Sequence, residues 1–220
     1  MTWLDRLERK LRRFGIPNLM TYIVGGMALV FVADLLLPVN LYALLSLNMP
    51  LVMQGEVWRL ITFIFLPPST SIIWIIFSLY FYWMLGSGLE SQWGAFRFTL
   101  FYLVGILGSI AAAAISGGYV QNTYLNLSLF LAFAALYPNH QIMLFMFIPV
   151  KMKYLAILDL VLYGWMFVTG TWGTRWAILF ALANVILFVG GSFVRYIKQD
   201  SQYWKTRYHF RKQMRENNKK

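Results

Sequence analysis

Four polar side chains stand inside long apolar runs of this sequence, where they could take part in chemistry. Asn126 and Ser128 lie close together in one run, and Asp159 and Asn184 lie in two later runs. If these runs cross a membrane, the acid is a functional candidate by default, because an ionised group is costly in hydrocarbon. The three neutral side chains are expected to form hydrogen bonds between helices.

Groups that could activate a hydroxyl or hold a metal are scarce. The chain has two histidines, His140 and His209, no cysteine, and neither an HExxH sequence nor a paired Asp motif. Thiol catalysis, iron–sulfur clusters and disulfides are therefore excluded. Two histidines without cysteine also argue against a structural metal site. A Ser or Thr nucleophile needs a base within hydrogen-bonding reach. We expect no metal and no cofactor.

The composition requires a lipid environment for the apolar runs. Of the 220 residues, 60% are apolar and 12% are charged, and the mean hydropathy is +0.61. These values exceed what a soluble domain of this size buries in one core. Charged residues are absent for 30 positions after Arg59 and for 53 positions after Arg97. Because a membrane-spanning helix needs about 20 apolar residues, these gaps hold one and two spans.

Six spans are predicted, so the expected fold class is all-α, a polytopic membrane protein with a six-helix transmembrane bundle. The spans cover Leu19–Leu37, Ile72–Leu89, Phe98–Ile115, Thr123–Tyr137, Lys153–Val168 and Trp176–Val194. The fourth and fifth are short and are interpreted as thin or tilted helices sheltered by their neighbours. The apolar segment Ile142–Val150 contains Pro149 and is expected to lie along the membrane interface.

The distribution of Lys and Arg predicts the orientation, since positively charged flanks stay on the cytoplasmic side. With six spans, 17 of the 19 cations fall on one side, and only Arg59 and Arg175 fall on the other. Both termini are therefore expected in the cytoplasm. The net charge of +11 then reflects topology and attraction to anionic lipids, and no nucleic-acid partner is expected.

Three regions follow from these patterns. Residues 1–17 place Trp, Leu and Phe on one helical face and Arg or Lys on the other, which is typical of a helix that lies in the membrane interface. Residues 18–195 form the membrane domain, and residues 196–220 form a basic cytoplasmic tail. The full-length apolar run behind the first region argues against a cleaved signal peptide.

Two motifs resemble those of the rhomboid and Derlin superfamily. Residues 55–63 read GEVWRLITF and resemble its Trp-Arg loop, while residues 86–94 read GSGLESQWG and are similar to its GxxxExxxG element. Residues 131–139 and 148–155 resemble the end of the rhomboid fourth helix and the start of the fifth. The resemblance covers about residues 55–194. It implies a rhomboid-like six-helix bundle of bacterial type in the cytoplasmic membrane.

The second motif also has a physical explanation of its own. Gly86 and Gly94 remove side chains from one helix face, which lets a neighbouring helix approach closely. Glu90 lies near the predicted cytoplasmic end of its span, where Arg97 or backbone donors could satisfy its carboxylate. We interpret this motif as a clamp that holds the fold and not as a catalytic element.

Trp58 and Arg59 suit a loop at the membrane interface. An aromatic ring is stable at headgroup depth, and a cation there can hold backbone carbonyls or lipid phosphates. Both residues are therefore interpreted as structural.

Active rhomboid proteases use a Ser in a GxSG element at the start of the fourth span and a His in the sixth, with a His and an Asn in the second span supporting the oxyanion. The resemblance places the nucleophile position on Thr123 and the oxyanion positions on Trp74 and Ser78. The two glycines of the GxSG element are not found around Thr123, and the predicted sixth span contains no His. The sequence therefore predicts degenerate catalytic positions and no catalytic residue.

Three hypotheses for function follow. The first is a rhomboid-like pseudoprotease that binds or regulates other membrane proteins through their transmembrane segments, as in Derlin-like client recognition or quality control. The second is an active intramembrane serine protease with an atypical site at Ser128 or Thr123. The third is a small transporter or channel component, motivated by Asp159 and Asn184.

Overall fold

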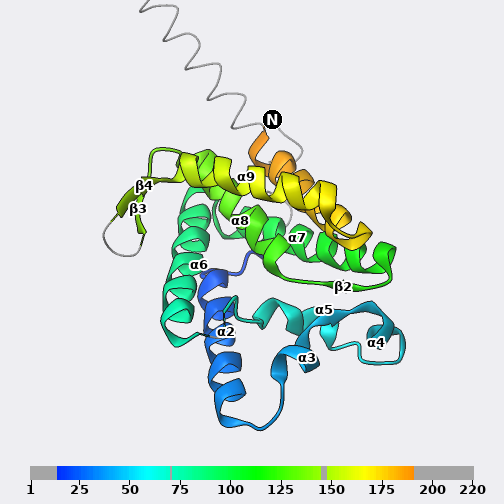
Figure 1. Ribbon diagram of the computed structural model, residues 1–220. Coiled ribbons are helices and arrows are strands. Elements are labelled where there is room, and N and C mark those ends of the chain that lie inside the picture. Colours follow the sequence, from blue (N-terminus) through cyan, green and yellow to red (C-terminus); the bar gives the residue numbers. More distant parts are fainter. Residues whose placement is uncertain (1–13, 70, 145–147, 191–220) are drawn as a thin grey trace, which may run out of the picture.

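The computed structural model describes residues 14–69, 71–144 and 148–190, and helices make up most of that part of the chain (Figure 1). Each predicted span corresponds to a helix. They are α2 (Leu19–Leu36), α6 (Ile72–Trp93), α7 (Ala95–Ser116), α8 (Thr123–Leu136), α9 (Met152–Thr169) and a last helix, Trp172–Gly190. Five of the six are long and apolar enough to cross a membrane. The fold is therefore an all-α polytopic membrane bundle.

The predicted boundaries differ from the observed ones mainly where charges stand at helix ends. Helix α6 continues beyond Glu90 to Trp93, and α7 begins at Ala95, before Arg97. The last helix begins at Trp172, earlier than predicted, and its end past residue 190 lies outside the described residues. Residues 1–13 of the predicted interfacial helix and the predicted tail 196–220 also lie outside them.

Helix α8 is the short central element that the sequence predicts. Its 14 residues rise only about 21 Å, which is less than the roughly 30 Å of a bilayer core. Ten of these residues are buried, and α6, α7 and α9 all contact the helix. Because protein surrounds most of α8, the deficit in length exposes little backbone to lipid.

Helix α9 is the least covered of the long helices. Met152, at its first position, is its single buried residue, whereas most of its large apolar side chains are exposed. It contacts α8 and the strand that precedes it, and Arg175 of the last helix donates to the carbonyls at its end. One side of the bundle is therefore closed by a helix that is loosely attached to the core.

The connection between α2 and α6 is long and structured. It contains α3 (Leu41–Leu45), β1 (Leu47–Asn48), α4 (Met49–Met53), α5 (Arg59–Thr62) and the 3₁₀ helix η2 (Phe63–Phe65). Strand β1 pairs antiparallel with β2 (Tyr119–Val120), which lies just before α8. Asn122 Nδ2 donates to the Leu66 carbonyl at 2.7 Å. This connection is therefore fixed to the start of α8.

The segment expected along the interface forms a β-hairpin. Strands β3 (Gln141–Leu144) and β4 (Ile148–Lys151) pair antiparallel between α8 and α9, and Figure 1 shows them projecting from the bundle. As expected, the segment does not form a membrane-spanning helix. Its pairing as two strands was not predicted. A short apolar run does not by itself distinguish a strand from a helix.

Candidate functional site

The Glu90 carboxylate holds the chain where α2 begins. Its Oε1 accepts a hydrogen bond from the Asn18 backbone N–H at 2.7 Å, and Asn18 precedes α2 with a left-handed φ of 55°. Two residues earlier, the Ile16 N–H donates to Thr99 Oγ1 at 3.1 Å. A carboxylate is favourable at a helix N-terminus, where backbone N–H groups lack partners. Glu90 therefore has a structural role, because its carboxylate accepts a hydrogen bond from a backbone N–H.

The two motif glycines act in different ways. A Cβ on Gly86 would lie 2.3 Å from the Met20 Cγ, so the missing side chain lets α6 contact α2 closely. The same expectation is wrong for Gly94, because a Cβ there would meet nothing within 4 Å. Gly94 instead has a φ of +82° in the turn between α6 and α7. Only glycine adopts this backbone conformation without strain.

Arg59 organises the connection between α2 and α6. Its guanidinium is 4% exposed and donates to the carbonyl oxygens of Ala43 at 2.7 Å and Ser46 at 3.0 Å. Its Nε also donates to Glu56 Oε2 at 2.6 Å. Trp58 is half exposed beside it. The interpretation of the cation as a holder of carbonyls fits these bonds.

Tyr42 joins the same connection to the start of α6. Its hydroxyl donates to the carbonyls of Pro67 and Ser69, both at 3.2 Å. Burial, with a smaller contribution from the Asp34 charge, raises the pKa of Tyr42 to about 12. The phenol therefore remains a neutral donor at physiological pH.

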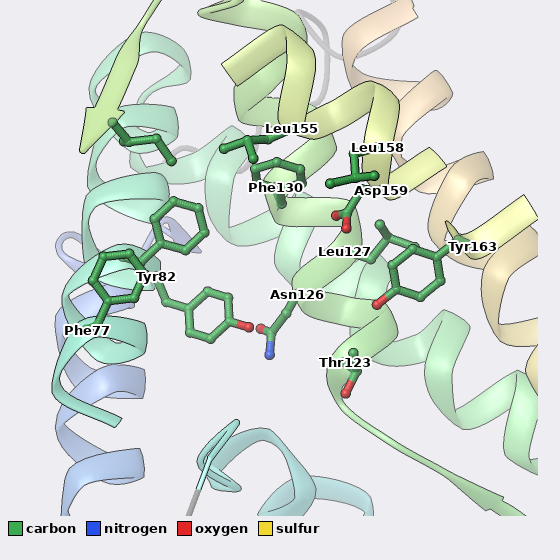
Figure 2. Close-up of a pocket in the computed structure, with 12 residues that line it drawn as sticks. Phe77, Tyr82, Thr123, Asn126, Leu127, Phe130, Leu155, Leu158, Asp159 and Tyr163 are labelled. Atoms are coloured by element: carbon green, nitrogen blue, oxygen red, sulfur yellow. The ribbon is translucent and has the colours of Figure 1, made fainter. Parts of the chain in front are cut away.

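A cavity of about 320 Å³ lies between α6, α8 and α9. Its wall combines aromatic rings, aliphatic side chains and a few polar groups, as Figure 2 shows. The lining residues are Phe77, Phe81, Tyr82, Thr123, Asn126, Leu127, Phe130, Ile142, Leu155, Leu158, Asp159 and Tyr163. No His or Lys is among them, so this wall offers no imidazole or amine as a base.

Thr123, at the predicted nucleophile position, is the first residue of α8 and lines this cavity. Its side chain is exposed, and Oγ1 lies 3.5 Å from the Gln121 side-chain oxygen, at the limit of a hydrogen bond. A neutral amide oxygen is a very weak base and does not activate a hydroxyl. Thr123 therefore lines the cavity without an imidazole or amine base on the same wall.

The predicted oxyanion positions are not part of the cavity wall. Trp74 is about half exposed, and the Ser78 hydroxyl donates to the Trp74 carbonyl of its own helix at 2.7 Å. The residues of α6 that line the cavity are Phe77, Phe81 and Tyr82. Neither position therefore lines the cavity that Thr123 lines.

Asn126 and Asp159 are brought together by the cavity. Asn126 is 3% exposed, and among the described residues neither its Nδ2 nor its Oδ1 has a hydrogen-bond partner. Figure 2 shows the Tyr82 hydroxyl facing its carboxamide, and the Asp159 carboxylate and Tyr163 hydroxyl on the α9 side.

The other two intramembrane candidates lie elsewhere. Asn184, on the last helix, donates from Nδ2 to the Phe101 carbonyl of α7 at 3.2 Å, as expected for a bond between helices. Ser128 is fully buried, but its hydroxyl donates to the Leu125 carbonyl of its own helix at 2.7 Å. A Cβ on Gly105 would lie 3.1 Å from Asn184 Nδ2 and 3.8 Å from Ser128 Oγ. Both side chains therefore pack against α7.

Sequence reasoning missed the aromatic part of the cavity. Tyr82 and Tyr163 carry hydroxyls inside long apolar helices, and this pattern was the available signal. Their convergence depends on how α6 and α9 face α8, which spacing within one helix does not reveal. The described residues contain no group of three or more His, Asp or Glu that could hold a metal. His140 contacts the Phe133 ring and is not among the lining residues.

A second cavity, of about 420 Å³, lies between α8, α9 and the last helix. Lys153 is the one charged residue in its otherwise apolar wall. Thr123, Asn126 and Asp159 are not among its lining residues.

The comparisons with known proteins agree with this geometry at the level of the family. A family model described as the Rhomboid domain matches residues 54–198, which include the Arg59 loop, the Glu90 clamp and the cavity. No curated protein matches the chain.

Proposed function

The chain belongs to the rhomboid family, and from this premise we propose that it is a pseudoprotease that binds transmembrane segments of other proteins without cleaving them. One observation carries the proposal. The cavity between α6 and α9 reaches Thr123 at the start of α8, but no His or Lys lines it. The cavity therefore offers no imidazole or amine base to activate a hydroxyl nucleophile.

The surroundings of the cavity support binding from within the bilayer. Helix α9 forms one wall and exposes most of its large apolar side chains, with Leu158 of the wall 55% exposed. A segment in the membrane can therefore reach the wall without unfolding the bundle. Asn126, which is buried and has no hydrogen-bond partner among the described residues, gives polar groups of such a segment a place to pair. A polar side chain in hydrocarbon is stabilised when it forms such a hydrogen bond.

Site-specific photo-crosslinking tests the proposal directly. A photoreactive residue at Leu158, which lines the cavity, is expected to crosslink membrane proteins in native membranes. The matched control is Val161 on the same helix, which is 64% exposed but is not a lining residue. Lipid surrounds both positions, so a difference between them reports on the cavity.

The products identify the class of partner. We expect uncleaved membrane proteins, with the crosslinked residue inside a transmembrane segment. Equal crosslinking at Leu158 and Val161, or none at either, would contradict a binding role for this cavity.

An active protease with an atypical site is the second candidate. Thr123 shares the cavity with Asp159, so a hydroxyl and a carboxylate line one wall. Reconstitution of the purified chain with a labile transmembrane substrate tests this candidate. Cleavage that disappears in Thr123→Ala but persists in Ser128→Ala would favour it over the pseudoprotease.

We also propose the orientation, with both termini in the cytoplasm. Because the chain has no Cys, single cysteines can be added without removing native ones. Gly118→Cys, before α8, should react with an impermeant maleimide in intact cells. Asn139→Cys, after α8, should react only when the cells are opened. The reverse labelling pattern would contradict the proposed orientation.

A further inference from the structure

Asp159 is an acid in the middle part of a membrane helix without a cationic partner. It stands six residues past Lys153, or roughly 9 Å along α9. The salt bridge found among the described residues joins Arg59 to Glu56, far along the chain from it. A carboxylate at this depth is either neutral or paired with a cation. Among the described residues, no Lys or Arg forms a salt bridge with Asp159.

Aromatic rings form much of the wall around this carboxylate. Phe81 lies 6.2 Å from Phe77 and 6.0 Å from Phe130, measured between ring centroids. Tyr82 and Tyr163 complete the aromatic set. The face of an aromatic ring attracts cations, most strongly where water is excluded. Rings and carboxylate together make a wall that favours positive charge.

The remaining polar groups offer oxygen atoms to a donor. Asn126 is 97% buried, as its 3% exposure shows, and its Oδ1 accepts no hydrogen bond from the described residues. Figure 2 shows the Tyr82 hydroxyl and the Asn126 carboxamide close together on the α6 side of the cavity, and the Tyr163 hydroxyl on the α9 side with Asp159. Ammonium and guanidinium groups carry only donors, so they match this set of acceptors.

We propose that the cavity recognises the side-chain cation of a Lys or Arg carried by a transmembrane segment of a partner protein. The inference rests on the proposed function and names the segments that the site selects. A volume of about 320 Å³ is at the lower end for ligand pockets, which suits one side chain. The depth of Asp159 below the start of α9 favours a cation on a segment over the amine of a lipid headgroup.

The test measures binding of synthetic transmembrane helices to the full chain in nanodiscs of phosphatidylglycerol. The helices are identical except for one central residue, which is Leu, Gln, Lys, Arg or Glu. The wild-type chain should bind the Lys and Arg helices at least tenfold more tightly than the Leu and Gln helices. Asp159→Asn should lose this preference while binding the Leu helix as the wild type does. Asp159→Glu should retain it.

A reversal of charge separates recognition from structural effects. Asp159→Lys should prefer the Glu helix, which a loss of folding could not produce. Tight binding of all five helices without a preference would overturn the cation proposal and leave the proposed function intact. No binding of any helix would overturn both. A preference that disappears when phosphatidylethanolamine is added would assign the site to a headgroup amine and would also overturn the proposal.

Discussion

The contact between α2 and α6 differs sharply from the wall that α6, α8 and α9 share. At the first, Gly86 fits against Met20, and the Glu90 carboxylate accepts the Asn18 N–H. At the second, α9 has a single buried residue, and Asn126 has no hydrogen-bond partner among the described residues. One region satisfies its groups within the fold. The other leaves polar groups unmatched beside a cavity.

This difference separates residues that hold the fold from residues that are available to a partner. Buried polar groups are normally paired, and an unpaired one costs free energy that selection tolerates where a ligand supplies the partner. Of the motif residues, Gly86 and Glu90 lie in the paired region. The Asn126 carboxamide, which has no hydrogen-bond partner among the described residues, lines the same cavity as Thr123.

The largest expected effect comes from Arg59, which is compared here with Arg175, a second arginine that binds backbone carbonyls. Arg59→Ala should lower the free energy of unfolding by about 3 kcal/mol, because two carbonyls and the Glu56 carboxylate lose their donor. Arg175 binds the carbonyls of Phe167 and Val168 at the end of α9 but is only partly buried. Arg175→Ala should cost less than about 1 kcal/mol.

Unfolding by SDS in mixed micelles measures both values. Equal losses for the two variants would remove the distinction between the regions. Arg59→Lys should fall between wild type and Arg59→Ala, since a Lys keeps the charge but not the fork of donors.

One added methyl group tests the two helices next. Gly86→Ala should destabilise the chain by about 2 kcal/mol, because the new Cβ overlaps Met20, which is fully buried. Gly164→Ala on α9 meets nothing within 4 Å and should stabilise by about 0.5 kcal/mol through helix propensity. Melting temperatures in detergent give the comparison. A harmless Gly86→Ala would mean that α2 and α6 are not in close contact.

Two asparagines sharpen the same contrast with effects of opposite sign. Asn126→Leu removes an unpaired buried amide and should raise the free energy of unfolding by about 1 kcal/mol. Asn184→Leu removes the donor to the Phe101 carbonyl and should lower it by about 1 kcal/mol. Destabilisation by Asn126→Leu as large as that by Asn184→Leu would show that Asn126 has a partner in the folded chain.

The smallest effect is expected at the clamp itself. Glu90→Gln keeps an acceptor for the Asn18 N–H but loses the charge that strengthens the bond. The bond is partly open to solvent, so the cost should be about 0.5 kcal/mol. Glu90→Ala, which removes the acceptor, should cost more in the same unfolding assay. Identical stability of both variants and wild type would leave Glu90 without a structural role.

The spans were predictable from the sequence because charge-free gaps and apolar length constrain membrane helices strongly. The structural role of Glu90 was also predictable, because a carboxylate at a helix end needs a hydrogen-bond donor. The N–H of Asn18, at the start of α2, supplies it. The reason for Gly94 was not, because a positive φ cannot be told from a close helix contact by residue type. The hairpin over residues 141–151 was missed for a similar reason, since its apolar run is short.

The cavity was only partly predictable. Thr123, Asn126 and Asp159 were identified as single residues, but nothing in their spacing shows that they share a wall with Tyr82 and Tyr163. That arrangement depends on how three helices face one another. Ser128 illustrates the same limit, because it lies one helical half-turn from Asn126 yet turns away from the cavity.

We propose that this rhomboid-family chain binds membrane segments at the cavity without cleaving them. Labelling with a fluorophosphonate probe in native membranes tests it most directly, with an active rhomboid protease labelled in parallel as the positive control. The account predicts no labelling of this chain above the level seen with Thr123→Ala and Ser128→Ala. Reproducible labelling of the wild type that disappears in either variant would contradict it.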